Sequence, residues 1–260
     1  MTYTETHVVA AIEQLAAQEI GTLTQPQLDG IDQFHAGGTD AVDRILPSLR
    51  LHPPMTALDV GSGFGGPARQ VARSTGCDVV GVDLTRSYVE TATALTPAVA
   101  SGPRVEFLCT DVAKLERRDF DAAYTIHVQM NVSDKKAFFT DIASRLRGGA
   151  RLAIFEVCRN GLQDPELPLP WSIDGSDSHL VTSDDLRGSI EDSGFETVEW
   201  VDETGWILEW FAELGARLGR AGTAATLPAL LYDGPTRMLN FAGALASGVL
   251  SVHRGAFTRA

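Results

Sequence analysis

Short apolar runs alternate with amphipathic stretches through the middle of the chain. The apolar runs have the length of strands and are bounded by glycine or aspartate. They cover residues 56–60, 78–83, 105–109, 120–126 and 150–157. Helical periodicity fills the intervals, over residues 67–75, 86–95 and 135–146. Strands that alternate with helices at this spacing predict a mainly parallel sheet with helices on both faces.

The two ends of the chain have a different pattern. Residues 5–19 and most of 203–248 are helical in periodicity, while 195–201 and 250–258 read as two further strands. We expect the last strand to pair antiparallel at the sheet edge. The predicted fold is therefore α/β: a Rossmann-like, doubly wound, mainly parallel seven-stranded sheet with an antiparallel last strand and a helical lid. We predict one domain over 1–260, made of a 51–202 core with two attached pieces, an N-terminal helical cap (1–50) and the helical lid (203–248).

Charge and cysteine content limit the classes of partner and the cellular compartment that we expect. The formal net charge of −13 argues against a nucleic-acid partner, which requires clustered Lys and Arg. No stretch approaches the roughly 20 apolar residues of a membrane span, and the acidic N-terminus does not read as a signal peptide. We expect Cys77, Cys109 and Cys158 to be reduced and buried in a cytoplasmic protein. No C-x-x-C or H-E-x-x-H pattern indicates a metal site.

The sequence from Thr56 to Pro67, TALDVGSGFGGP, reads as a buried strand, a glycine turn and the start of a helix. Such a turn lets a ligand approach the backbone, and the helix start offers unpaired N–H groups. Other polar residues stand at or just after the predicted strands. These residues are Asp59, Asp83, Asp111, His127 and Glu156. In a parallel sheet they would gather along one rim, where ligands bind.

Two cofactors compete for this rim. Gly61, Gly63 and Gly66 satisfy G-x-G-x-x-G, and Asp83 follows about twenty residues later, as in nicotinamide dinucleotide sites. S-adenosylmethionine is favoured by Asp59, placed to help hold an amino-acid group, and by Asp111, placed to accept a hydrogen bond from adenine. The chain also lacks a Tyr-x-x-x-Lys pair for hydride chemistry.

Several segments resemble the motifs of class I S-adenosylmethionine-dependent methyltransferases. They are ALDVGSGFGGPARQVA, VVGVDLT, CTDV and RLRGGARLAIFEV. DQFHAGG (32–38) and HVQMNV (127–132) resemble the small-molecule branch that includes sarcosine/dimethylglycine and ubiquinone/menaquinone-type methyltransferases. The resemblance spans roughly residues 29–200.

The resemblance implies a role for each matching position. Asp59 with Gly61 and Gly63 would hold the methionine end, and Ser62 stands where many relatives have cysteine. Asp83 would accept the ribose hydroxyls. Leu84, Asp111 and Val112 would contact adenine. The backbone at His127 would lie beside the sulfonium. The residues that would close over the methionine moiety are Gln33, Phe34, His35 and Gly38.

The expected reaction is transfer of a methyl group to O, N or C of a small-molecule acceptor. A hydroxyl acceptor needs a base, for which His127 is the first candidate and His35 the second; either could instead be a structural histidine. Trp171, Trp206 and Trp210 could line a pocket, although aromatics at helical spacing usually form core. The alternatives are an S-adenosylmethionine-binding protein that does not methylate and a nicotinamide-dependent oxidoreductase. We expect no metal, no nucleic acid and no membrane partner, and we allow for a homodimer.

Overall fold

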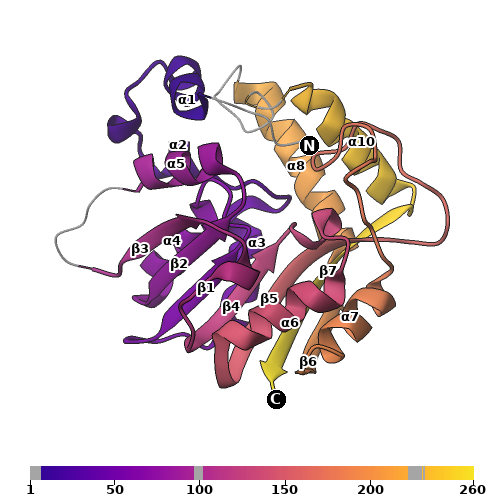
Figure 1. Ribbon diagram of the computed structural model, residues 1–260. Coiled ribbons are helices and arrows are strands. Elements are labelled where there is room, and N and C mark those ends of the chain that lie inside the picture. Colours follow the sequence, from indigo (N-terminus) through magenta and orange to yellow (C-terminus); the bar gives the residue numbers. More distant parts are fainter. Residues whose placement is uncertain (1–6, 97–101, 222–229, 231) are drawn as a thin grey trace.

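The computed structural model describes residues 7–96, 102–221, 230 and 232–260 (Figure 1). Seven strands form one sheet in the order β3-β2-β1-β4-β5-β7-β6. The strands are β1 (Thr56–Val60), β2 (Asp78–Asp83), β3 (Val105–Cys109), β4 (Phe120–Ile126), β5 (Leu146–Arg159), β6 (Phe195–Asp202) and β7 (Leu250–Arg259). The predicted fold class is confirmed.

The first five strands run parallel, and β1 lies between β2 and β4. The last strand, β7, is antiparallel to its neighbours, as expected, but its predicted place at the edge is wrong. It pairs with both β5 and β6, so that β6 forms the edge. The physical reason is burial: β7 is buried along most of its length, whereas the middle of β6 is exposed. An interior place in the sheet leaves neither edge of this mostly buried strand unpaired.

Helices cover both faces of the sheet. On one face α3 (Gly38–Leu49) and α4 (Gly66–Thr75) share a core with alternate residues of β1 and β4. On the other face α6 (Lys135–Arg145) and α7 (Ser183–Glu191) pack on the remaining residues. The alternation follows from the strand geometry, since successive side chains point to opposite faces. The predicted strand 150–157 begins four residues earlier, because α6 ends at Arg145 and β5 starts at once.

The remaining helices lie toward the carboxyl ends of the parallel strands, at the top of Figure 1. They are α1 (Val8–Ala16), α2 (Gln25–Asp29), α5 (Arg86–Ala94), α8 (Thr204–Ala221) and α10 (Gly234–Ala246). The first two belong to the expected cap, and the last two to the expected lid; that these pieces act as cap and lid stays a prediction. Within the described residues, no helix combines the length and the apolarity needed to cross a bilayer.

Candidate active site

The turn after β1 carries the backbone of the site. The amides of Gly61 and Ser62 both donate to the carbonyl of Val82 at the end of β2, at 2.8 and 3.0 Å. Gly61 has φ +81°, and a Cβ there would lie 2.4 Å from Val128 Cγ2. Only glycine fits both the left-handed backbone and this close approach. The turn is therefore pressed between the ends of β2 and β4, and its backbone forms part of the cavity wall.

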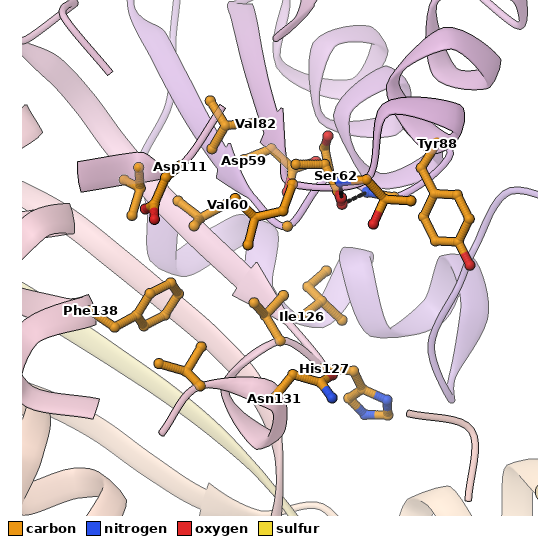
Figure 2. A pocket seen from close by; sticks show the side chains of 18 of the residues that line it. Asp59, Val60, Ser62, Val82, Tyr88, Asp111, Ile126, His127, Asn131 and Phe138 are labelled. Carbon is orange, nitrogen blue, oxygen red and sulfur yellow. Dashed lines mark hydrogen bonds between the residues drawn. The ribbon is translucent and has the colours of Figure 1, made fainter. Parts of the chain in front are cut away.

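A cavity of about 490 Å³ opens at these strand ends (Figure 2), within the size range of small-molecule sites. Asp59, Ser62 and Tyr88 lie on one side of it, and His127 and Asn131 on the other, while Asp111 and Phe138 mark its far end. The predicted rim therefore exists as one cavity. The predicted site residues that line it are Phe34, His35, Asp59, Gly61, Ser62, Gly63, Asp83, Leu84, Asp111, Val112 and His127.

Asp83 is held by two backbone amides. Gly63 N donates to one carboxylate oxygen at 2.9 Å, and Thr85 N donates to the other at 2.8 Å. Burial raises the pKa of Asp83 above its usual value, and these hydrogen bonds oppose that rise. Leu84, the next residue, is 73 % exposed and offers an apolar surface at the cavity. Asp111 accepts from Ala113 N at 3.0 Å.

Asp59 is a deeply buried acid of the site. It is 2 % exposed, and one of its carboxylate oxygens has no protein partner. Burial raises the pKa of Asp59 to about 8, opposed by the nearby Tyr124 hydroxyl. The Ser62 hydroxyl beside the glycine turn also lacks a protein partner. Buried polar atoms are normally hydrogen-bonded, so this part of the cavity fits a polar ligand that supplies donors.

A buried ion pair fastens the N-terminal segment to α4. Arg69 donates to Asp32 at 2.7 Å and to the carbonyl of Phe64 at 2.7 Å. Burial raises the pKa of Asp32 to about 6 in spite of the adjacent guanidinium. Above this pair, the rings of Phe34, Phe64 and Tyr88 contact one another with centroids 4.8–5.7 Å apart. The pair and the rings place the 32–38 segment against the cavity.

His127 stands on a left-handed backbone (φ +53°) just after β4. The two amides that follow, of Val128 and Gln129, donate to the buried carboxylate of Glu156 at 3.0 and 3.2 Å. Burial raises the pKa of Glu156 to about 7, while these hydrogen bonds lower it. Glu156 was expected at the rim. It lies instead beneath the cavity, where it stabilises the turn that carries His127.

The two candidate bases lie close together. The rings of His35 and His127 have centroids 6.1 Å apart. His35 Nε2 lies 3.0 Å from the carbonyl of Gly38, so Nε2 carries the proton and donates it. Burial lowers the pKa of His35 to about 4, and burial lowers the pKa of His127 well below its usual value. Both rings are therefore neutral at pH 7, and His127 Nε2 has no protein partner.

Two predicted cofactor residues do not line the cavity. Gln33 is buried and donates to the side chain of Gln70 at 3.2 Å. The carbonyl of Gly38 is occupied by His35, and its Cα side faces Trp210. None of the three candidate tryptophans lines it either. Trp171 is buried in the core, which agrees with the structural reading. Cys109 is exposed, against expectation, because it ends the half-covered strand β3.

Several cavity residues were missed by the sequence reasoning. Asp32 and Tyr88 approach from the N-terminal segment and α5, and Asn131 follows His127. A face of α6 also contributes. Asp134, which caps α6, and Ala137, Phe138 and Asp141 of α6 line the cavity. They recur at helical spacing, a pattern that could have indicated them. No group of three or more possible metal ligands occurs in the part of the chain that the structure describes.

Comparison with known proteins resolves the choice between the two cofactors. Residues 57–149 match the family described as "Methyltransferase domain", and this match includes the glycine turn, Asp83 and Asp111. Over residues 57–149 the chain is thus similar to methyltransferase domains. The predicted cofactor class is thereby confirmed for this domain.

Individual relatives are distant. An O-methyltransferase of Pyrenophora dematioidea is 29 % identical over 61 % of this chain and 60 % of its own. Phosphoethanolamine N-methyltransferase 3 of Arabidopsis thaliana is 29 % identical over 74 % of this chain and 39 % of its own. The chain thus spans less than two thirds of the length of these methyltransferases. Among solved structures, phosphoethanolamine N-methyltransferase 2 of Haemonchus contortus shares the fold, with a TM-score of 0.74, 18 % identity, and coverage of 100 % of this chain and 58 % of its own.

Proposed function

We propose that this protein transfers a methyl group from S-adenosylmethionine to a small-molecule acceptor. The observation that carries the proposal is the shared cavity of Asp59, Asp83, Asp111 and His127, which come from four different strand ends. The amide-held carboxylate of Asp83 and the partnerless oxygen of Asp59 suit a ligand rich in hydrogen-bond donors. S-adenosylmethionine is such a ligand, with an ammonium, two ribose hydroxyls and an adenine amine.

Different residues of the chain would bind different parts of this ligand. Asp83 would accept from the ribose hydroxyls. Leu84 and Val112 would pack on the adenine ring, whose amine would donate to Asp111. Asp59 and the backbone of Gly61 and Gly63 would hold the methionine end. Phe34 would cover that end, with its ring against Phe64 and Tyr88. Gln33 and Gly38 would support this segment without contacting the ligand.

The bound cofactor supplies an electrophilic methyl group and departs as a neutral thioether. The protein then has to position the acceptor and exclude water. If the acceptor is a hydroxyl, His127 Nε2 is the base, because it is neutral and has no protein partner. A base with a lowered pKa accepts the proton as the acceptor attacks, when the hydroxyl has become more acidic. His35 is held as a donor to Gly38 and is the second candidate.

Isothermal titration calorimetry of the purified chain tests the proposal. We expect S-adenosylmethionine and S-adenosylhomocysteine to bind, and NADH not to bind. Tight binding of NADH with no response to either sulfur ligand would overturn the proposal. Binding without turnover of labelled cofactor across an acceptor panel would favour the non-methylating alternative. The cytoplasmic location, the homodimer, the absence of a bound metal and the branch of the family stay predictions.

A further inference from the structure

The end of the cavity at His35 and His127 offers no positive charge to an acceptor. Among the described residues that line the cavity there is neither Lys nor Arg. The ionisable side chains that line it, besides the two histidines and Tyr88, are aspartates: Asp32, Asp59, Asp83, Asp111, Asp134 and Asp141. An acceptor that carries a phosphate or carboxylate would enter this acidic site without a counter-ion. Burying such a charge unpaired is strongly unfavourable.

The cations near this end are already engaged. Lys135 Nζ donates to the carbonyls of Gln129, Val132 and His179, which uses its three N–H groups. Since a lysine ammonium has only three donors, Lys135 cannot turn to an acceptor without leaving a buried carbonyl unpaired. This lysine stabilises the loop after His127 and is unavailable to bind an anion.

Arg44 of α3 and Arg237 of α10 are engaged as well. Arg44 pairs with Glu203 at 3.1 Å, and its guanidinium lies 4.0 Å above the ring of Trp206. Arg237 is fully buried and donates to the carbonyls of Leu169, Pro170 and Tyr232. Each of these cations stabilises the protein itself.

Aromatic rings surround His127. Phe155 stacks on it with centroids 5.9 Å apart, and Phe241 meets it edge-on at 6.0 Å. Trp206 contacts Phe155, and Trp171 contacts Phe241. His127 Nε2 is the polar atom without a protein partner among these rings, and it is buried. An acceptor must therefore part the rings of α8 and α10 to reach Nε2.

We propose that this aromatic end takes an uncharged, largely apolar acceptor whose hydroxyl bonds to His127 Nε2. The proposal rests on the proposed function. The hydroxyl of the acceptor would donate a hydrogen bond to Nε2, which has no protein partner. The apolar body of the acceptor would replace the ring–ring contacts that the acceptor displaces. A phosphorylated acceptor does neither, because the local cations are engaged and the nearest acids repel it.

Matched probe pairs test this inference. The full chain, saturated with S-adenosylhomocysteine, is titrated with phenol, 2-naphthol and geraniol, and separately with their phosphate monoesters. NMR follows His127 Cε1–H and Trp206 Nε1–H. We expect at least one neutral probe to bind at least about tenfold more tightly than its phosphate twin and to shift both resonances. His127→Phe, which keeps a stacking ring, should weaken the hydroxyl probe about tenfold, whereas His52→Ala should not.

The outcomes separate the two proposals. Equal or tighter binding of a phosphate twin overturns the acceptor class, as does failure of every neutral probe to bind the liganded protein. Binding that His127→Phe leaves unchanged also overturns it. Failure of S-adenosylhomocysteine itself to bind contradicts the proposed function instead. Retained binding of this ligand by His127→Phe shows that the variant is folded.

Discussion

The carboxylate of Asp83 accepts a hydrogen bond from the backbone amide of Gly63 at 2.9 Å, across 20 residues of chain. This contact joins the end of β2 to the glycine turn that follows β1. The other oxygen of Asp83 accepts from Thr85, so one side chain orders the start of α5 and the turn together. The acid proposed to bind ribose therefore also holds the backbone proposed to bind the methionine end.

Asp83→Ala should weaken binding of S-adenosylhomocysteine at least about tenfold, since each hydrogen bond to a charged group contributes roughly 1.5–3 kcal/mol. It should also lower the free energy of unfolding, because the turn loses its anchor. Calorimetry measures the first effect, and urea unfolding measures the second.

Asp78→Ala is the matched control for this variant. Asp78 stands at the opposite end of the same strand and accepts from the backbone amide of Arg104 at 2.7 Å. Its loss should leave ligand affinity within about twofold. Unchanged affinity in Asp83→Ala would contradict the ribose assignment.

Gly61→Ala should be among the most damaging small substitutions in the chain. The left-handed backbone costs an alanine roughly 1–2 kcal/mol, and the overlap with Val128 adds about 1–3 kcal/mol. Adding Val128→Ala should relieve the overlap and leave only the backbone cost. Gly188→Ala, in helix α7 with nothing within 4 Å, should instead stabilise by roughly 0.5–1 kcal/mol. Urea unfolding of Gly61→Ala, Val128→Ala, the double variant and Gly188→Ala measures these effects. Losses of the two single variants that add up in the double variant would exclude the contact.

His127→Asn should slow methylation of a hydroxyl acceptor by about 10² or more, whereas exposed His52→Ala should not change the rate. Burial lowers the pKa of His127, so its acidic limb in a pH–rate profile should lie below the usual histidine range. Titration of His127 should then leave the rate unchanged between pH 6.5 and 8. In NMR, His35 Cε1–H should titrate near pH 4, where burial places its pKa. A His127 titration midpoint near 6.5 would contradict the buried geometry.

Stability should fall as pH rises from 6.5 to 8. Burial raises the pKa of Asp59 to about 8, so the folded protein holds a proton that the unfolded chain has already lost. Because the native state binds more protons in this window, the free energy of unfolding decreases with pH. Glu156, with its pKa raised by burial to about 7, acts in the same direction.

Asp59→Asn should flatten this dependence by roughly 1–2 kcal/mol across the window, since one pKa unit corresponds to about 1.36 kcal/mol. Urea unfolding of the ligand-free protein at several pH values provides the measurement. Wild-type stability that rises over this range would show that Asp59 is already ionised at pH 6.5.

Local order along the chain was enough to predict the strands, the helices between them and the acids at the strand ends. Asp59, Asp83 and Asp111 could be assigned to one rim because each lies at or directly after a strand, and parallel strands end on one side. The glycine spacing predicted the turn, since few other residues adopt its backbone. These features depend on near neighbours in sequence, so a single chain shows them.

Only the tertiary structure decided which way side chains face and what surrounds them. It placed β7 inside the sheet and paired Asp32 with Arg69. It turned Gln33 away from the cavity and Glu156 beneath it, and it lowered the pKa of His127 by burial. Each result depends on contacts between residues far apart in sequence, because burial and pairing are set by packing that no local pattern encodes.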